Sequence, residues 1–264
     1  NAPSHLHLGD SVSIFPGFPI GRWGTYGEII NIPAKDVINN LKNSSHEESA
    51  ALWMQYSTAY GGIVTFADVQ PGQYVVIRAA SSSVGIAAIQ IVNALGAIPV
   101  AVTRGQDKVQ QLIEYGAKYV VTSDTQDIYT EINRIISENN GNLHLVFDPV
   151  GGKEVTTFVK LLSYGGFFLQ YGALDHSDLS IPVFELLSKA LTIYGYLIPE
   201  ARKTPEYLPK LIDFVHKGLE SGKLKPVIDK KTFTFNDIAK AQDYMETNQQ
   251  VGKIIVTVPQ EGSN

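Results

Sequence analysis

Six short apolar runs, separated by segments with helical spacing, constrain the fold of this 264-residue chain more than any other feature. The runs span residues 74–79, 98–103, 119–122, 143–148, 166–171 and 191–196. The segments between them, at 84–95, 106–115, 128–139, 154–162 and 183–189, repeat apolar residues at helical spacing and often end at a glycine. Runs that are apolar at every position, such as Tyr74 to Ile77, are typical of strands covered by helices on both faces. The sequence therefore predicts an α/β fold with a doubly wound parallel sheet.

The two ends of the chain have a different residue pattern from the central part. Residues 5–35 are rich in Gly, Pro and short apolar alternations, which predicts strands and turns. Ser45 followed by Glu48 forms a capping-box pattern, so we expect a helix to start near His46. After the last apolar run, the sequence predicts a helix near 205–221 and then short strands around a helix at 233–258.

Composition narrows the range of functions. The chain has 21 Lys and Arg against 26 Asp and Glu, so its net charge of -5 favours neither nucleic acid nor an anionic membrane as a partner. It has no cysteine, which excludes disulfides, thiolate nucleophiles and zinc sites with sulfur ligands. No apolar stretch approaches the roughly 20 residues that cross a bilayer. We expect a cytoplasmic protein that acts on a small-molecule substrate.

Small residues join the first strand to its helix, at Ala79 to Gly85. They allow the backbone to approach a pyrophosphate, which the helix N-terminus then binds through free N–H groups. Ala80 and Ser82 stand where the dinucleotide fingerprint has glycines, and only Gly85 is retained. The alternative is an ordinary tight turn, against which the flanking βαβ pattern argues.

The second strand ends at Thr103 and Arg104, with Lys108 behind them. An acidic residue here would bind the ribose 2′-hydroxyl of NAD, whereas an arginine suits the 2′-phosphate of NADP. The alternative is a solvated basic pair at a helix start, where Asp107 weakens the local field. The sequence favours NADP(H) as the cofactor.

Five segments in this order, WMQYSTAYG, AASSSVGIAAIQ, VTRGQDK, VFDPVGG and GKIIV, resemble the medium-chain dehydrogenase/reductase family. The resemblance covers Gly9 to Val258 and is greatest to the branch of quinone oxidoreductases and zinc-free alcohol-dehydrogenase-like proteins. It implies a Rossmann domain at 51–223 inserted into a GroES-like β-barrel catalytic domain built from 1–50 and 224–264. LGDSVSIFP resembles a later barrel strand and not the family's opening segment, so an incomplete barrel is expected.

The resemblance also implies roles for individual residues. Met54 stands where zinc-dependent members have a ligand cysteine, so we expect no metal. The remaining residues are expected to bind the cofactor: Thr58 near the nicotinamide; Ser82, Ser83 and Val84 at the pyrophosphate; Thr103, Arg104 and Lys108 at the adenosine end; Pro149, Val150, Tyr171, Gly172, Gly195, Tyr196 and Leu197 in loops at the carboxyl edge of the sheet; and Gly252 and Lys253 from the barrel side. As alternatives, Thr58 could only cap or pack a helix, Gly172 and Gly195 could be turn glycines, and Lys253 a solvated charge.

No catalytic residue can be assigned, because the six histidines are scattered and Tyr56 and Tyr60 are more typical of a core. Two function classes remain open. One is an NADPH-dependent oxidoreductase that transfers hydride to a quinone, enone or carbonyl without zinc. The other is a dinucleotide-binding protein with little turnover. A homodimer joined through the 191–196 edge strand is also implied.

Overall fold

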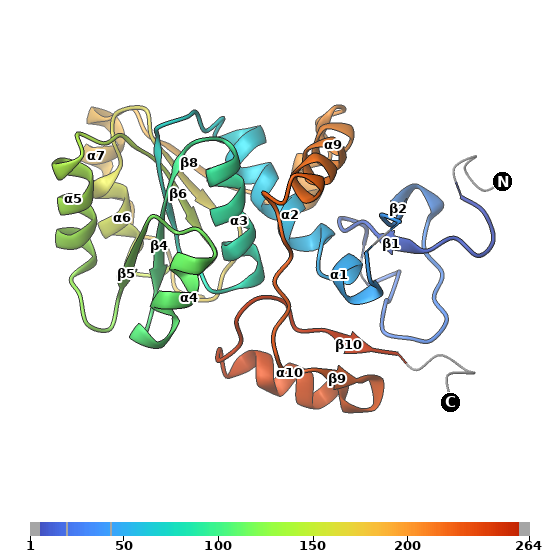
Figure 1. The fold of residues 1–264 in the computed structure, drawn as a ribbon. Coiled ribbons are helices and arrows are strands. Elements are labelled where there is room, and N and C mark those ends of the chain that lie inside the picture. The colour runs from blue at the N-terminus through green and yellow to red at the C-terminus, as the bar shows by residue number, and fades with distance from the viewer. Residues whose placement is uncertain (1–5, 20, 43, 259–264) are drawn as a thin grey trace.

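A parallel six-stranded sheet dominates the computed structural model, which describes residues 6–258 except residues 20 and 43 (Figure 1). Its strands lie in the order β5-β4-β3-β6-β7-β8. Their bounds are β3 (Tyr74–Ile77), β4 (Ile98–Thr103), β5 (Tyr119–Thr122), β6 (Leu143–Asp148), β7 (Phe167–Gln170) and β8 (Thr192–Gly195). The doubly wound sheet is confirmed, and each expected strand lies within two residues of its predicted ends. The strand order reverses between β3 and β6, and such reversal points are where open sheets bind ligands.

Helices cover both faces of this sheet (Figure 1). One face carries α3 (Ser83–Ala94) and α4 (Val109–Glu114), and the other carries α5 (Ile128–Glu138), α6 (Val155–Leu161) and α7 (Val183–Ser188). Within β3, Val75 and Ile77 pack in the first apolar cluster, whereas Tyr74 and Val76 pack in the second. Burial on both faces explains why the strands are apolar at every position.

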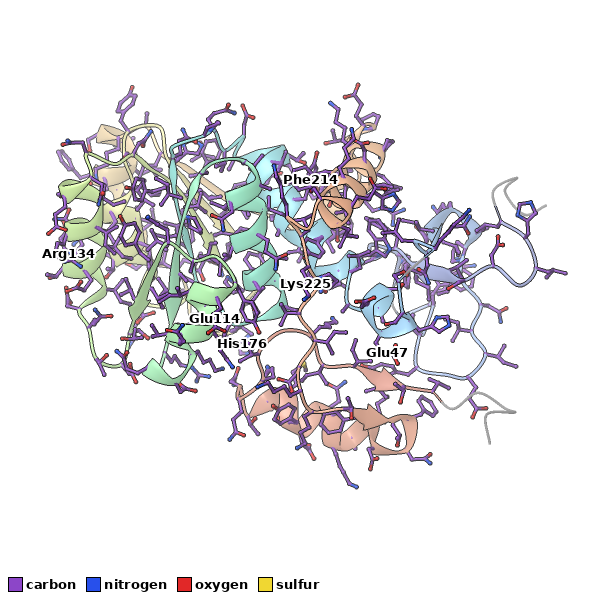
Figure 2. The ribbon with its side chains drawn as sticks, in the orientation of Figure 1. Glu47, Glu114, Arg134, His176, Phe214 and Lys225 are labelled. Carbon is purple, nitrogen blue, oxygen red and sulfur yellow. The ribbon has the colours of Figure 1, made fainter. Side chains whose placement is uncertain are left out.

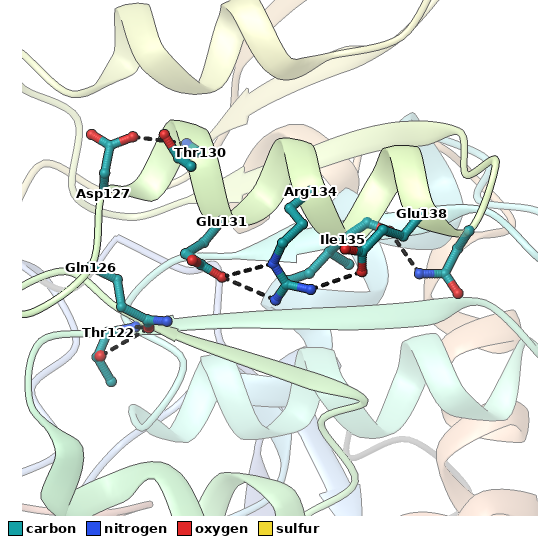
Figure 3. A network of polar contacts seen from close by, with 9 residues as sticks. Thr122, Gln126, Asp127, Thr130, Glu131, Arg134, Ile135 and Glu138 are labelled. Carbon is teal, nitrogen blue, oxygen red and sulfur yellow. Dashed lines mark hydrogen bonds and ion pairs between the residues drawn. The ribbon is translucent and has the colours of Figure 1, made fainter.

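The outer face of α5 is polar (Figure 3). Asp127 caps the helix by accepting a hydrogen bond from the Thr130 backbone N–H at 2.8 Å. Arg134 bridges Glu131 and Glu138, one turn to either side. Exposed pairs of this kind contribute less than about 1 kcal/mol each, so the buried inner face anchors the helix.

The helix predicted near His46 begins there, as α1 (His46–Ala50). Its capping box is complete, because Ser45 accepts from the Glu48 N–H at 3.1 Å and Glu48 accepts from the Ser45 N–H at 3.0 Å. The chain then leaves the helix before α2 (Trp53–Tyr60), which continues as the π-helical segment η2 (Gly61–Phe66). A Cβ on Gly62 would lie 2.6 Å from the Phe147 ring, so glycine permits this close approach to β6.

Further helices and strands lie outside the main sheet. They are β1 (Val12–Ile14), η1 (Ala34–Asp36), β2 (Val37–Asn39), α8 (Ile198–Ala201), α9 (Tyr207–Glu220), β9 (Phe233–Thr234), η4 (Phe235–Asp237), α10 (Ile238–Glu246) and β10 (Val256–Thr257). Strand β1 pairs antiparallel with β2, and β9 pairs parallel with β10. The expected GroES-like barrel stays a prediction, since the described parts of 1–50 and 224–264 form these two small sheets and residues 1–5 and 259–264 lie outside the description. No described helix is long and apolar enough to cross a membrane.

One buried amide joins the sheet domain to the C-terminal part. The Gln90 side-chain oxygen accepts from the Tyr56 hydroxyl at 2.6 Å and from the Lys225 N–H at 2.9 Å, and its amide donates to the Lys225 carbonyl at 2.9 Å. Figure 2 shows Lys225 on the extended segment that leaves α9 for the C-terminal elements. Gln90 therefore fixes this segment against α2 and α3.

Candidate functional site

The turn between β3 and α3 has the features of a phosphate-binding loop. Ala79 has a φ of +47°, in the left-handed region that non-glycine residues seldom adopt. Ser82 caps α3 by accepting from the Gly85 N–H at 3.1 Å. A Cβ on Gly85 would lie 2.6 Å from the Ala80 carbonyl oxygen, so only glycine fits here. The first N–H groups of a helix have no intrahelical acceptor, which leaves those of Ser83 and Val84 available to an anion.

Residues 248–252 lie against this loop. The Gly252 N–H donates to the Ser81 carbonyl at 3.1 Å, and Ser82 and Gly252 form a parallel bridge. Lys108 Nζ donates to the carbonyls of Asn248 at 2.8 Å and Gln250 at 3.3 Å and contacts Ser81 Oγ at 3.4 Å. Burial lowers the pKa of Lys108. The structure thus places Lys108 between the loop that follows β4, the turn that follows β3 and the C-terminal part.

Lys253 follows this contact and is held by its backbone. Its N–H donates to the Val227 carbonyl at 2.8 Å, and its own carbonyl accepts from the Asp229 N–H at 2.9 Å. Burial lowers the pKa of Lys253. Within the part of the chain that is described, no hydrogen bond or ion pair reaches its Nζ. An ammonium group that is partly desolvated without a counter-charge favours a bound anion.

An exposed arginine, Arg104, follows directly after β4. Thr103 is buried, whereas Arg104 is exposed and its guanidinium has no partner among residues 6–19, 21–42 and 44–258. A Cβ on Gly105 would lie 2.6 Å from an Asp107 carboxylate oxygen and 3.7 Å from one of Asp124. Two carboxylates therefore border the loop and weaken the positive field that Arg104 creates.

A buried ion pair that was not predicted from the sequence lies at the reversal point of the sheet. Arg78, which is 4% exposed, donates to the fully buried Asp148 at 2.7 Å and also contacts Glu154. It donates as well to the Gly151 carbonyl at 3.0 Å. The other Asp148 oxygen accepts from the N–H groups of Val150 at 2.6 Å and Gly151 at 3.2 Å. Burial raises the pKa of Asp148, and Arg78 opposes that shift.

This network fixes the loop that contains Pro149 and Val150. The sequence signal that could have revealed this ion pair was a charged residue near the end of each of two apolar runs, Arg78 and Asp148. It becomes informative only once β3 and β6 are known to be neighbours.

Aromatic residues gather at the carboxyl ends of β7 and β8. Tyr171 stacks on Phe147 with ring centroids 4.0 Å apart, and its buried hydroxyl has no partner among the described residues. Burial raises the pKa of Tyr171, so this hydroxyl stays protonated. Tyr196 donates to the Thr58 carbonyl, while the Thr58 hydroxyl donates to the Met54 carbonyl at 2.7 Å.

A cavity of about 590 Å³ opens beside these rings. Its lining residues are Gln170, Tyr171, Gly172, Ala173, Tyr194, Gly195, Tyr196, Leu197, Pro199 and Glu200. Five of the residues expected to bind the cofactor, those at 171–172 and 195–197, therefore line one cavity. The residues expected to bind the cofactor at the ends of β3, β4 and β6, or in the loops that follow them, lie along the same edge of the sheet. Thr58, in contrast, belongs to α2.

Met54 is 47% exposed and lies on α2. Over the described ranges, no three His, Cys, Asp or Glu side chains are grouped as a metal ion would require.

Comparisons with known proteins agree with this architecture. A family model described as zinc-binding dehydrogenase matches residues 83–217, just over half of the chain. The synaptic vesicle membrane protein VAT-1 homolog of Danio rerio is 25% identical over 266 residues, which cover 95% of this chain and 53% of that protein. The chain thus spans about half the length of this relative.

Two solved structures are similar over most of the chain. The CurK enoyl reductase is 27% identical, with a TM-score of 0.73 over 86% of this chain and 67% of that one. The quinone oxidoreductase of Thermus thermophilus, also solved in complex with NADPH, is 25% identical, with a TM-score of 0.75 over 89% of this chain and 73% of that one. By its family match, its strand order and these likenesses, the chain belongs to the medium-chain dehydrogenase/reductase family, in the quinone oxidoreductase-like branch.

Proposed function

We propose that the chain binds NADPH along the carboxyl edge of its sheet and reduces a quinone, enone or carbonyl compound without zinc. The observation that carries this proposal is the tight turn at Gly85 after β3, together with the exposed Arg104 after the neighbouring strand β4, whose guanidinium has no partner among the described residues. The similar proteins described as an enoyl reductase and as a quinone oxidoreductase complexed with NADPH support it.

The residues present fit a dinucleotide of this kind. Ser83 and Val84 offer N–H groups to the pyrophosphate, and the Gly85 position leaves no room for a side chain. Arg104 offers a fork of donors to the 2′-phosphate. Lys253 supplies a charge that lacks a partner in the described structure.

The cavity beside β7 and β8 is the proposed site of the nicotinamide and the acceptor. When bound, NADPH would supply the hydride, and the chain would orient it toward the acceptor. Tyr171, Tyr194 and Tyr196 give the cavity aromatic walls, which suit a flat, weakly polar acceptor. The neutral Tyr171 hydroxyl is a hydrogen-bond donor at pH 7.

The direct test is NADPH oxidation with a panel of quinones, enones and aldehydes, run beside NADPH binding followed by nucleotide fluorescence. We expect binding, and turnover with at least one of these classes. If neither NADPH nor NADH binds, the proposal is wrong.

A binding protein with little turnover is the second candidate. Two observations support this second candidate. The residues that line the cavity all come from 170–200, and the described parts outside the main sheet form two-stranded sheets. Such a cavity has less protein around it to exclude water. NADPH binding without oxidation by any acceptor would favour this candidate.

We expect purified protein to contain no stoichiometric zinc and to keep its NADPH affinity after treatment with a chelator. The reason is that Met54 offers only a neutral thioether and the chain contains no cysteine. Elemental analysis measures this directly. One tightly bound zinc per chain would contradict the prediction.

We also expect a homodimer joined through β8. This strand lies at the edge of the sheet, and the preceding helix α7 exposes Phe184 (80%) and Leu187 (74%). A second copy would pair the open strand edge and cover these side chains. The double substitution Phe184→Glu and Leu187→Glu is expected to yield monomers in light scattering, whereas Ile29→Glu, between β1 and β2, is expected to leave the dimer intact. A monomeric wild type at micromolar concentration would exclude this assembly.

A further inference from the structure

A second cavity, of about 330 Å³, lies where α2, α3 and α9 meet. It shares no lining residue with the cavity beside β7 and β8. On α3 it is lined by Ala94, the last residue of the helix, whereas the turn that we propose binds the pyrophosphate precedes the first residue, Ser83. A helix of 12 residues is about 18 Å long, so the cavity is well separated from that turn.

Two aromatic rings form the apolar floor of this cavity. Tyr60 on α2 and Phe214 on α9 have ring centroids 5.2 Å apart, and Figure 2 shows Phe214 on the side of α9 toward α2. Tyr60 is 6% exposed, and its hydroxyl forms no hydrogen bond with any residue of 6–19, 21–42 or 44–258. Burial raises the pKa of Tyr60, so the hydroxyl is a neutral donor at pH 7. A ligand atom that accepts from this hydroxyl would satisfy it.

Three lysines line the same cavity, and one of them has no counter-charge. Lys217 pairs with Asp213 at 2.8 Å, and Lys210 pairs with Glu206. Lys223, which is exposed, forms no ion pair within the described part of the chain. Three ammonium groups therefore stand against two carboxylates, and the local field favours an anion.

The turn after α9 fixes the position of Lys223. The Gly218 carbonyl accepts from the Leu224 N–H at 2.9 Å, and Gly222 has a φ of +71°, which turns the chain back along the helix. A Cβ on Gly218 would lie 2.4 Å from the Leu224 side chain, so glycine permits this close packing. The backbone that carries Lys223 is thus ordered before any ligand binds.

We propose that this cavity binds a small organic anion with a flat apolar body. The body would lie on the rings of Tyr60 and Phe214, and its carboxylate would accept from the Tyr60 hydroxyl near the Lys223 ammonium group. The volume is within the range of ligand pockets in proteins. This site is separate from those proposed for NADPH and for the acceptor, and it does not depend on them.

The first test follows backbone amide shifts by NMR during titration with naphthalene-1-carboxylate. We expect saturable shifts at Ala94 and Gly218, which line the cavity, and the same shifts when NADPH is present in excess. Naphthalene-1-carboxamide has nearly the same shape without the charge, and it is expected to bind about 10-fold more weakly. Higher ionic strength is expected to weaken the carboxylate, because Lys223 is exposed to solvent.

Two variants then separate the contributions of the two polar groups. Tyr60→Phe keeps the ring contacts and removes the donor, so it is expected to weaken the carboxylate about 10-fold. Lys223→Met is expected to weaken it about 3-fold, since an exposed charge contributes less. The matched controls are Tyr129→Phe, on the outer part of α5, and Lys118→Met, at an exposed lysine before β5. Both controls are expected to leave the affinity unchanged.

Three outcomes would overturn the proposal. They are an absence of shifts at Ala94 and Gly218, displacement of the carboxylate by NADPH, and equal affinity for the carboxylate and the carboxamide. Unchanged affinity in both Tyr60→Phe and Lys223→Met would overturn it as well. If Tyr60→Phe does not fold, as judged by circular dichroism, Lys223→Met and the positions of the shifts decide. Protein that binds no dinucleotide would refute the proposed function alone, because the titration needs no cofactor.

Discussion

Arg104→Ala is expected to raise the Kd for NADPH by roughly 10- to 150-fold and to leave the Kd for NADH nearly unchanged. A hydrogen bond to a charged group contributes about 1.5 to 3 kcal/mol, which corresponds to this range. The guanidinium has no competing partner within the described chain, so its donors are free for the phosphate. Fluorescence titration with both dinucleotides measures the effect. Arg134→Ala, on the outer face of α5, is the matched control.

Arg104→Asp is expected to reverse or abolish the preference for NADPH. The carboxylate would repel the 2′-phosphate and accept hydrogen bonds from a free 2′-hydroxyl. Asp107 and Asp124, which border the same loop, would add to the repulsion. Should both variants weaken NADPH and NADH equally, Arg104 would be a stacking or folding residue.

Asp148→Ala is expected to lower the free energy of unfolding by about 3–5 kcal/mol, because Arg78 loses its fully buried charge partner and keeps only the half-exposed Glu154. The N–H groups of Val150 and Gly151 lose their acceptor at the same time. Urea unfolding followed by circular dichroism measures the change.

Two further variants test whether the loss of stability comes from the unpaired charge of Arg78 or from lost packing. The double substitution Arg78→Met and Asp148→Leu removes both charges and is expected to recover much of the lost stability. Glu154→Ala is expected to have a small effect, since Glu154 is about half exposed and Arg78 keeps Asp148. A loss below about 1 kcal/mol for Asp148→Ala would show that the pair is not required for the fold.

The strands were predictable because burial on both faces of the sheet requires apolar residues at successive positions of a strand. A strand such as β3, with one face in each apolar cluster, has no polar position, and a glycine follows most of the intervening helices. The tight turn between β3 and α3 was predictable for a similar local reason, whereas phosphate binding by this turn stays a prediction. Gly85 lies against the backbone of Ala80, and Ser82 caps the helix that follows.

Contacts between distant segments could not be predicted in this way. Arg78 and Asp148 are 70 residues apart, and only the strand order makes them neighbours. From the sequence, Lys108 could either bind the cofactor or be a solvated charge. Its contacts could not be predicted, because the carbonyls that it contacts belong to residues 140 and 142 positions later. The break between α1 and α2 was also missed, since apolar residues continue through it and burial there depends on α3 and α9.

The amide of Gln90 has a consequence for domain motion. It fixes the chain at Lys225, and the contacts of Lys108 and Ser81 fix it again at 248–252. A body attached at two points can turn only about the line that joins them. We therefore expect the elements between these points, including α10, to move by rotation about that line and not by separation from the sheet while both contacts hold. The smallest displacement is then expected at the loop of Ser81 and Ser82, where one of the two attachments lies.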